Sequence, residues 1–106
     1  MAVRTNVLIG ASTVAGGGVA TYTVPSGVRT IVKYVSFRFA GADLCSVDIR
    51  DVGLTSRQVI NRTGAGNNTS IELAPYLVLI SGEQLRLVNR GANSMNVYAS
   101  GVELLI

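Results

Sequence analysis

Apolar and polar residues alternate along most of the chain with the period of two that is typical of a β-strand. Residues 19–24 read Val-Ala-Thr-Tyr-Thr-Val, and residues 45–50 and 84–88 show the same alternation. Long stretches rich in Ala, Leu, Glu and Lys, which an α-helix favours, are absent. The pattern predicts strands with one face buried and the other exposed.

Turn-forming residues divide the chain at short and fairly even intervals. Glycine, proline, asparagine and aspartate gather at residues 16–18, 25–27, 41–43, 51–53, 64–68, 81–83 and 89–93. This spacing leaves about eight short segments and favours an antiparallel β-sandwich or barrel. We therefore expect an all-β fold in a single domain, residues 1–106, with residues 1–17 as an N-terminal arm or an edge strand.

Residues 28–40 form the longest apolar segment, and its strand pattern is apolar on both faces. Strict alternation places Ile31, Val35, Phe37 and Phe39 on one face and Val32 and Tyr34 on the other. A strand that is apolar on both sides is covered on both sides. One face is expected in the core, and the other against a neighbouring subunit or an overlying loop. The apolar residues 102–106 are likewise expected within a sheet or against a partner.

The charge content strengthens the expectation of a partner. Only 14% of the 106 residues are charged, against roughly 25% in an average globular protein. The formal net charge is +3 and 48% of the residues are hydrophobic. Much of the surface must therefore be neutral or apolar, and a large apolar patch usually marks a contact site. We expect self-association.

The residue types exclude several kinds of chemistry. The chain has no histidine and a single cysteine, Cys45, so neither a His or Cys metal site nor an internal disulfide can form. Asp48 and Asp51 lie three residues apart, which on a strand points them to opposite faces, so we interpret them as solvated charges. We expect no enzyme activity, no cofactor and no metal. No apolar stretch reaches eighteen residues, so no membrane-spanning helix is expected.

Two binding functions stay open at this point. Nucleic-acid binding needs clustered basic residues, whereas the nine here are spread along the chain, with Arg29 and Lys33 as the best candidate stripe; we expect no nucleic acid. Carbohydrate binding would use tyrosines near loop ends together with Asn and Arg side chains. The tyrosines are Tyr22, Tyr34, Tyr76 and Tyr98.

Three segments carry a resemblance to a known class of proteins. They are residues 22–33 (YTVPSGVRTIVK), 80–88 (ISGEQLRLV) and 98–103 (YASGVE). In this order they resemble small virion proteins of tailed bacteriophages, above all capsid decoration (cement) proteins, with tail or baseplate components as the alternative. The resemblance implies a jelly-roll β-sandwich, often trimeric, with Pro25, Gly27 and Gly82 as turn formers and no catalytic residues.

The hypothesis is therefore a structural virion protein that trimerises on the capsid surface and bridges neighbouring major capsid protein subunits. Its synthesis in the host cytoplasm agrees with the one unpaired cysteine. The alternative is a tail, baseplate or host-glycan-binding module that acts through loop tips. The candidate interface residues are Ile31, Lys33, Val35, Phe37, Phe39, Arg29, Arg38, Leu104 and Ile106.

Overall fold

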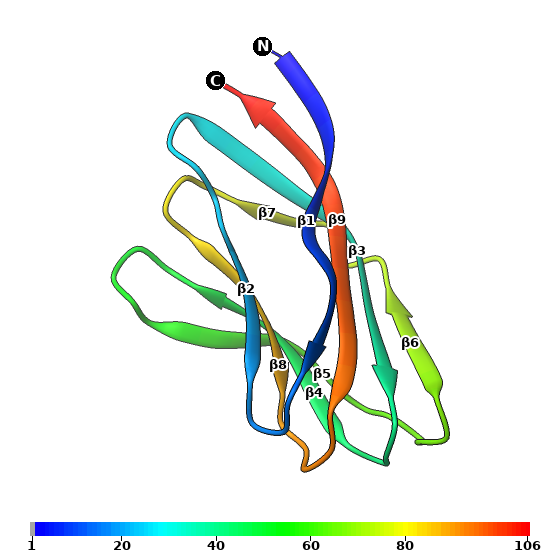
Figure 1. The fold of residues 1–106 in the computed structure, drawn as a ribbon. Helices are drawn as coiled ribbons and strands as arrows, with labels where there is room; N and C mark the ends of the chain where they lie inside the picture. The colour runs from blue at the N-terminus through cyan, green and yellow to red at the C-terminus, as the bar shows by residue number, and fades with distance from the viewer. Residues whose placement is uncertain (1) are drawn as a thin grey trace.

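The computed structural model describes residues 2–106, which form nine β-strands and no helix (Figure 1). The strands are β1 (Ala2–Val14), β2 (Val19–Thr23), β3 (Val28–Phe39), β4 (Leu44–Arg50), β5 (Ser56–Thr63), β6 (Thr69–Leu73), β7 (Leu77–Leu79), β8 (Gln84–Asn89) and β9 (Met95–Leu105). The prediction of an all-β sandwich is confirmed. Within residues 2–106, no helix is long and apolar enough to cross a membrane.

The strands form two antiparallel sheets whose order defines a jelly roll. One sheet runs β1-β9-β3-β6, with β7 also paired to β3, and the other runs β2-β8-β4-β5. β6 and β7 pair with successive lengths of β3, so together they act as one strand, interrupted around Pro75. The first strand then pairs with the last, the second with the last but one, and so on inward. This is a long hairpin rolled up into two layers, the jelly-roll arrangement.

A β-bulge in β3 corrects the expectation for residues 28–40. Pairing with β9 shifts register between Val32 and Tyr34, so Lys33 is an extra residue that reverses the alternation. Even-numbered residues up to Val32 face the core, and odd-numbered residues from Val35 onward do. Ile31 therefore does not share a face with Val35, and the segment is not apolar on both sides. Its core-facing residues are Val28, Thr30, Val32, Val35, Phe37 and Phe39.

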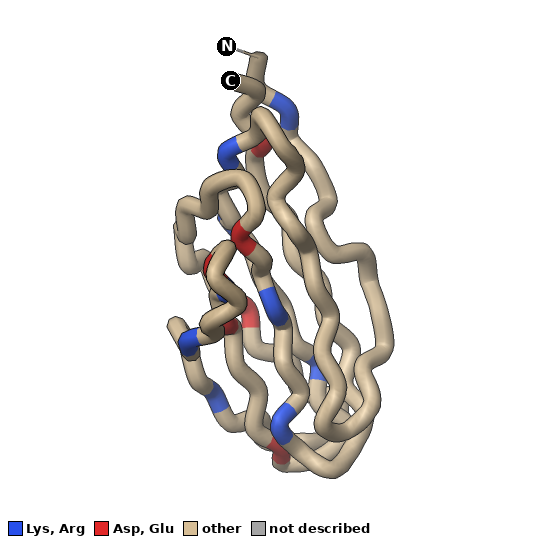
Figure 2. The backbone as a smooth tube through the Cα atoms, turned by 90° about the vertical axis from the view of Figure 1, so that its left-hand side faces the viewer, with Lys and Arg blue, Asp and Glu red and all other residues tan. Residues whose placement is uncertain are grey.

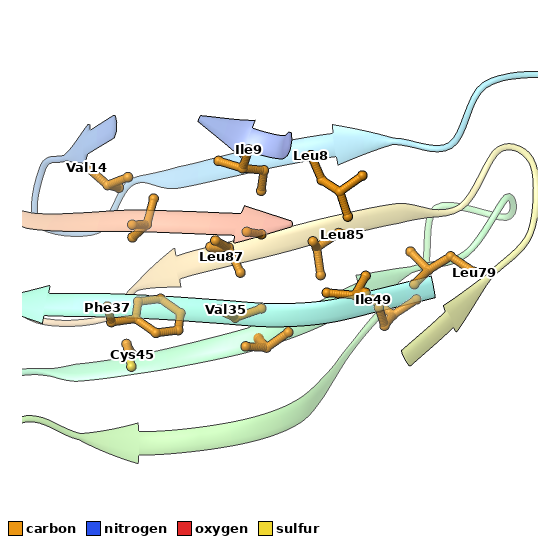
Figure 3. Close-up of a cluster of buried hydrophobic side chains, with 14 of the residues drawn as sticks. Leu8, Ile9, Val14, Val35, Phe37, Cys45, Ile49, Leu79, Leu85 and Leu87 are labelled. Atoms are coloured by element: carbon orange, nitrogen blue, oxygen red, sulfur yellow. The ribbon is translucent and has the colours of Figure 1, made fainter. Parts of the chain in front are cut away.

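The core fills the space between the two sheets (Figure 3). Consecutive residues Leu8 and Ile9 both point inward, because β1 has its own register shift between Val7 and Ile9. Full burial of an aliphatic or aromatic side chain contributes about 1.5–3 kcal/mol, so these residues dominate the stability of the fold. The most deeply buried apolar side chains are Val32, Val35, Phe37, Val47, Leu79, Leu85, Leu87 and Ala99.

The two ends of the chain lie side by side (Figure 1). β1 pairs with β9 from Ala2 opposite Leu105 to Val14 opposite Met95, so the N-terminal segment is an edge strand of the sheet. β9 lies between β1 and β3, which confirms that the apolar C-terminal residues are inserted in a sheet. The outer face of this sheet near the termini is consequently built from four different parts of the chain.

Candidate interaction surface

An apolar band crosses the outer face of the β1-β9-β3-β7 sheet, in the half that lies near the chain termini. The pairing of the strands brings the residues of this band together. Ile31 lies directly between Val102 and Val78, and Leu104 lies opposite Val3. Residues directly opposite one another in a sheet share a face. Thr5, opposite Val102, therefore lies on this face as well, whereas Glu103, between Val102 and Leu104, points inward. We define the apolar band as Val3, Val7, Ile31, Val78, Val102 and Leu104.

Several side chains of the apolar band are strongly exposed. Val3 is 64% exposed and Val78 57%, while Ile31, Val102 and Leu104 are half-buried by their neighbours. A single exposed valine is ordinary on a protein surface, but a contiguous group across four strands is not. The apolar band is therefore the candidate contact surface of the sheet.

Basic groups border the apolar band. Arg29 pairs with Leu104 in the register and is exposed. The Nζ atom of Lys33 lies 5.5 Å from the ring centroid of Tyr76, a cation–π arrangement. The band therefore has a cationic margin.

The structure separates the predicted interface residues into three groups. Ile31 and Leu104 belong to the apolar band, with Arg29 and Lys33 at its margin and exposed Ile106 just beyond β9. Arg38 is exposed on the same face but in the half far from the termini. Val35, Phe37 and Phe39 are at most 1% exposed in the core of their own chain, so the expectation that they reach a partner is wrong. The bulge at Lys33 is the physical reason.

The outer face of the other sheet, β2-β8-β4-β5, is mostly polar and contains an ion pair between a buried carboxylate and an exposed arginine. Arg90 Nη2 lies 2.9 Å from Asp48 Oδ2, and Arg90 Nε donates to Ser46 Oγ at 2.8 Å. Asp48 is only 5% exposed, so its interpretation as a solvated charge is wrong. Asp51 lies beyond the end of β4, where its Oδ1 accepts a hydrogen bond from the Thr55 backbone at 3.0 Å. Each carboxylate thus has its own local partner.

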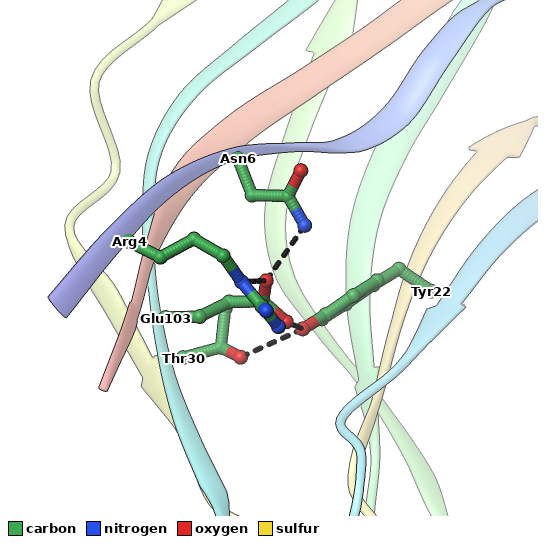
Figure 4. Close-up of polar contacts among 5 residues, drawn as sticks. All are labelled: Arg4, Asn6, Tyr22, Thr30 and Glu103. Atoms are coloured by element: carbon green, nitrogen blue, oxygen red, sulfur yellow. Dashed lines mark hydrogen bonds and ion pairs between the residues drawn. The ribbon is translucent and has the colours of Figure 1, made fainter. Parts of the chain in front are cut away.

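A second buried carboxylate, Glu103, ties the two sheets together near the termini (Figure 4). Its Oε1 accepts hydrogen bonds from Arg4 Nε at 3.0 Å and Asn6 Nδ2 at 2.6 Å, both on β1. Its Oε2 accepts from the Tyr22 hydroxyl of β2 at 2.7 Å, and that hydroxyl also shares a 2.9 Å hydrogen bond with Thr30 of β3. We call these five residues the carboxylate cluster. It joins four strands across both layers.

The carboxylate cluster perturbs the pKa of two of its members. Burial alone would raise the pKa of Glu103, but the hydrogen bonds from Tyr22, Asn6 and Arg4 outweigh it and hold the pKa below its usual value. Burial raises the pKa of Tyr22 to about 12, with a further contribution from the Glu103 carboxylate, although the hydrogen bond to Thr30 opposes the change. Tyr22 therefore remains a donor at neutral pH, and Glu103 remains ionised.

Sequence reasoning missed the carboxylate cluster. The available signal was a single glutamate, Glu103, within the apolar run 102–106, together with Tyr22 on the predicted core face of its strand. A buried charge requires hydrogen-bonding partners. The partner on β1, however, is almost a hundred residues away in sequence, and only the sheet order reveals it.

The remaining charges are scattered. Figure 2 shows the Lys, Arg, Asp and Glu positions distributed over the length of the molecule, among a large majority of uncharged residues. The Cys45 thiol lies in the core, where burial raises its pKa to about 11 despite the opposing charge of Arg62. The thiol therefore stays protonated and is a packing group in this position.

Comparison with known proteins supports the fold. No protein-family model and no curated protein matches the sequence. The Drosophila NLP core, a structure described in terms of pentamer formation and histone binding, matches 95% of this chain and 99% of its own at 12% identity and a TM-score of 0.56. A chain of the T13 viral particle of infectious bursal disease virus matches at 17% identity and a TM-score of 0.60, over 96% of this chain and 30% of its own.

A third solved structure comes from the appendages of Bacillus endospores, described as disulfide-linked pili. It matches 98% of this chain and 88% of its own at 10% identity, with a TM-score of 0.56. The chain is thus similar to jelly-roll domains of very different origin, a viral particle among them, and it spans less than a third of that viral chain. At these identities the likeness establishes the fold alone, because one fold serves many functions.

Proposed function

We propose that the chain is a structural virion protein, a capsid decoration (cement) protein of a tailed bacteriophage, with no catalytic role. Copies associate as a trimer on the capsid surface and bridge neighbouring subunits of the major capsid protein. The observation that carries the proposal is the apolar band, which runs across four strands of one sheet and has no cover within residues 2–106.

The area of the apolar band indicates how strongly two copies would bind each other. Four strands about 4.8 Å apart make the sheet about 19 Å wide, and the molecule is 43 Å long. The half of the face that holds the band is therefore about 400 Å², which is half of the ~800 Å² per partner in a standard specific interface. The contact between two free copies is accordingly weak, and many copies on one shell strengthen it through avidity.

The opposite face supports docking onto an acidic capsid surface. Arg50, Arg86 and Arg90 lie on or beside the outer side of the β2-β8-β4-β5 sheet, where Asp48 neutralises only one of them. Arginine is suited to paired contacts with carboxylates at interfaces. The sandwich would thus use one face for its own copies and the other for the shell. The similarity to a chain of a viral particle agrees with a location in the virion.

Sedimentation of the purified chain tests the self-association. We expect a mass that rises with concentration from 11.1 kDa toward three times that value. Val78→Lys places a charge at the β7 end of the apolar band, beside Ile31, and should abolish the rise. Leu44→Lys is the matched control, because Leu44 is also exposed and apolar but lies on the other sheet.

Two results would count against the proposal. One is a monomer at every concentration up to the millimolar range together with no binding to capsids of the phage that encodes the chain. The other is association that Val78→Lys leaves intact. Binding to capsids that Arg86→Glu abolishes, with self-association unchanged, would support the assignment of the polar face to docking.

A further inference from the structure

A hollow of about 240 Å³ lies on the same outer face as the apolar band, but in the half far from the termini. Two rows of paired residues across β9, β3 and β6 line it, together with Tyr34. Tyr98 pairs with Ser36, which pairs with Glu72, and Arg38 lies between Asn96 and Ser70 in the next row. Tyr34 occupies the following outward position of β3.

The hollow exists because small side chains are surrounded by long ones. The lining combines the short side chains of Ser36 and Ser70 with the longer ones of two tyrosines, an arginine and a glutamate. The rings of Tyr34 and Tyr98 meet edge to face, with centroids 5.9 Å apart and planes inclined by 62°. This packing holds the two rings in place as one wall of the hollow.

The lining offers unused hydrogen-bonding groups of both kinds. Asn96 accepts a hydrogen bond from Thr13 at 2.8 Å. Within residues 2–106, the other polar side chains of the lining have neither a side-chain hydrogen bond nor an ion pair. Arg38 can only donate, Glu72 can only accept, and the serine and tyrosine hydroxyls do both. A ligand rich in hydroxyl groups matches such a set, since every hydroxyl both donates and accepts.

Other ligand classes fit less well. The lining has one positive and one negative side chain, so it does not select an anion, and nucleic acid would need clustered basic groups. A peptide that extends a sheet needs a free strand edge. Of the three strands named above, β9 and β3 are paired on both sides, and within residues 2–106 only β6 has an unpaired edge. The hollow itself lies on the face of the sheet, where the strands offer side chains and not backbone groups.

We propose that this hollow binds a neutral oligosaccharide, with the C–H face of one sugar ring against the Tyr34–Tyr98 wall and its hydroxyls toward Ser36, Arg38 and Glu72. A volume of 240 Å³ lies below the ~300–1,000 Å³ of sites for drug-sized ligands, so one ring fits and the rest of the oligosaccharide runs along the open face. This binding goes beyond the structural role and uses a different half of the sheet from the apolar band.

NMR titration of the ¹⁵N-labelled full chain tests the proposal. The probes are hexasaccharides of glucose in α-1,4 and β-1,4 linkage, of mannose, of galactose and of N-acetylglucosamine, each added to about 10 mM so that binding near 1 mM is detected. At least one should cause saturable shifts confined to β3, β6 and β9. Tyr98→Ala should weaken that binding about tenfold, as expected for loss of an aromatic stacking partner.

Two further variants make the result decisive. Ser36→Leu fills the hollow without removing an aromatic group and should abolish binding. Tyr76→Ala removes a tyrosine that is more exposed than Tyr98 and lies outside the hollow, and it should leave binding unchanged. Unfolding curves of each variant establish that it is folded. Absence of binding by all five probes, or binding that both Tyr98→Ala and Ser36→Leu leave intact, would overturn the proposal and would leave the self-association unaffected.

Discussion

Replacement of Tyr22 by Phe is the sharpest test of the carboxylate cluster. The change removes one oxygen atom and keeps the ring that packs against the core. Glu103 loses a donor at 2.7 Å, and the Thr30 hydroxyl, which is fully buried, loses its partner at 2.9 Å. A hydrogen bond to a charged group contributes about 1.5–3 kcal/mol and a neutral one about 1 kcal/mol. The free energy of unfolding should fall by about 2–4 kcal/mol at pH 7.

The size of this loss makes it easy to measure. Domains of this length have a total stability of about 5–15 kcal/mol, so Tyr22→Phe should lower the melting temperature by about 10 °C or more. Urea unfolding at low protein concentration gives the difference in free energy without a contribution from association. Tyr76→Phe is the matched control, because Tyr76 is 63% exposed and lies outside the carboxylate cluster. It should unfold like the original chain.

The pH dependence separates the carboxylate cluster from simple packing. The pKa of Glu103 is lowered in the folded state, so its contribution is present above the unfolded pKa of about 4.3 and is lost as the pH falls through the folded value. Tyr22→Phe removes one cause of that lowering. The difference between the variant and the original chain should therefore shrink below about pH 4. A difference that is absent at pH 7, or constant down to acid pH, would refute the reasoning.

Two other predictions follow from the packing of the strands. Deletion of Lys33 removes the extra residue of the bulge and leaves a regular alternation in which Val32, Val35 and Phe37 still face the core, so we expect the variant to keep a cooperative unfolding transition by circular dichroism. Deletion of Ser36, in the regular part of β3, shifts one half of the strand by one position and turns core residues outward, so it should abolish the cooperative transition. The buried Cys45 thiol, whose pKa is raised to about 11, should not react with a disulfide reagent at pH 8 until urea unfolds the chain. Rapid reaction of the native thiol, loss of cooperative unfolding in the Lys33 deletion, or normal unfolding of the Ser36 deletion would contradict these expectations.

The sequence pattern predicted what depends on neighbouring residues. Alternation in residues 19–24 and 45–50 and the turn residues around Gly27 and Gly82 mark strands and turns that the structure contains. The sequence pattern could not predict the bulge in β3. The extra residue Lys33 is polar and exposed, as an outward-facing residue of a regular strand would also be. Strict alternation, continued past Lys33, therefore placed Phe37 and Phe39 on the face of Ile31, whereas they lie in the core.

Features that combine residues from distant parts of the chain could not be predicted from the local sequence pattern either. The apolar band contains residues from β1, β3, β7 and β9, each ordinary within its own strand. The sequence pattern identified Ile31 and Leu104 as interface candidates. Only the sheet order shows that they share a surface with Val3, Val7, Val78 and Val102. The carboxylate cluster needs the same information.

The pairing of the first strand with the last has a consequence for synthesis. Among the nine strands, β1 is synthesised first, whereas its sheet partner β9 is synthesised last. Closing so long a loop carries a large entropic cost, and topologies dominated by such distant contacts fold slowly. During translation, Leu8 and Ile9 have no finished core to enter. The nascent chain therefore exposes these apolar side chains of β1 until β9 has been synthesised, a period in which a chaperone or a neighbouring copy can bind them.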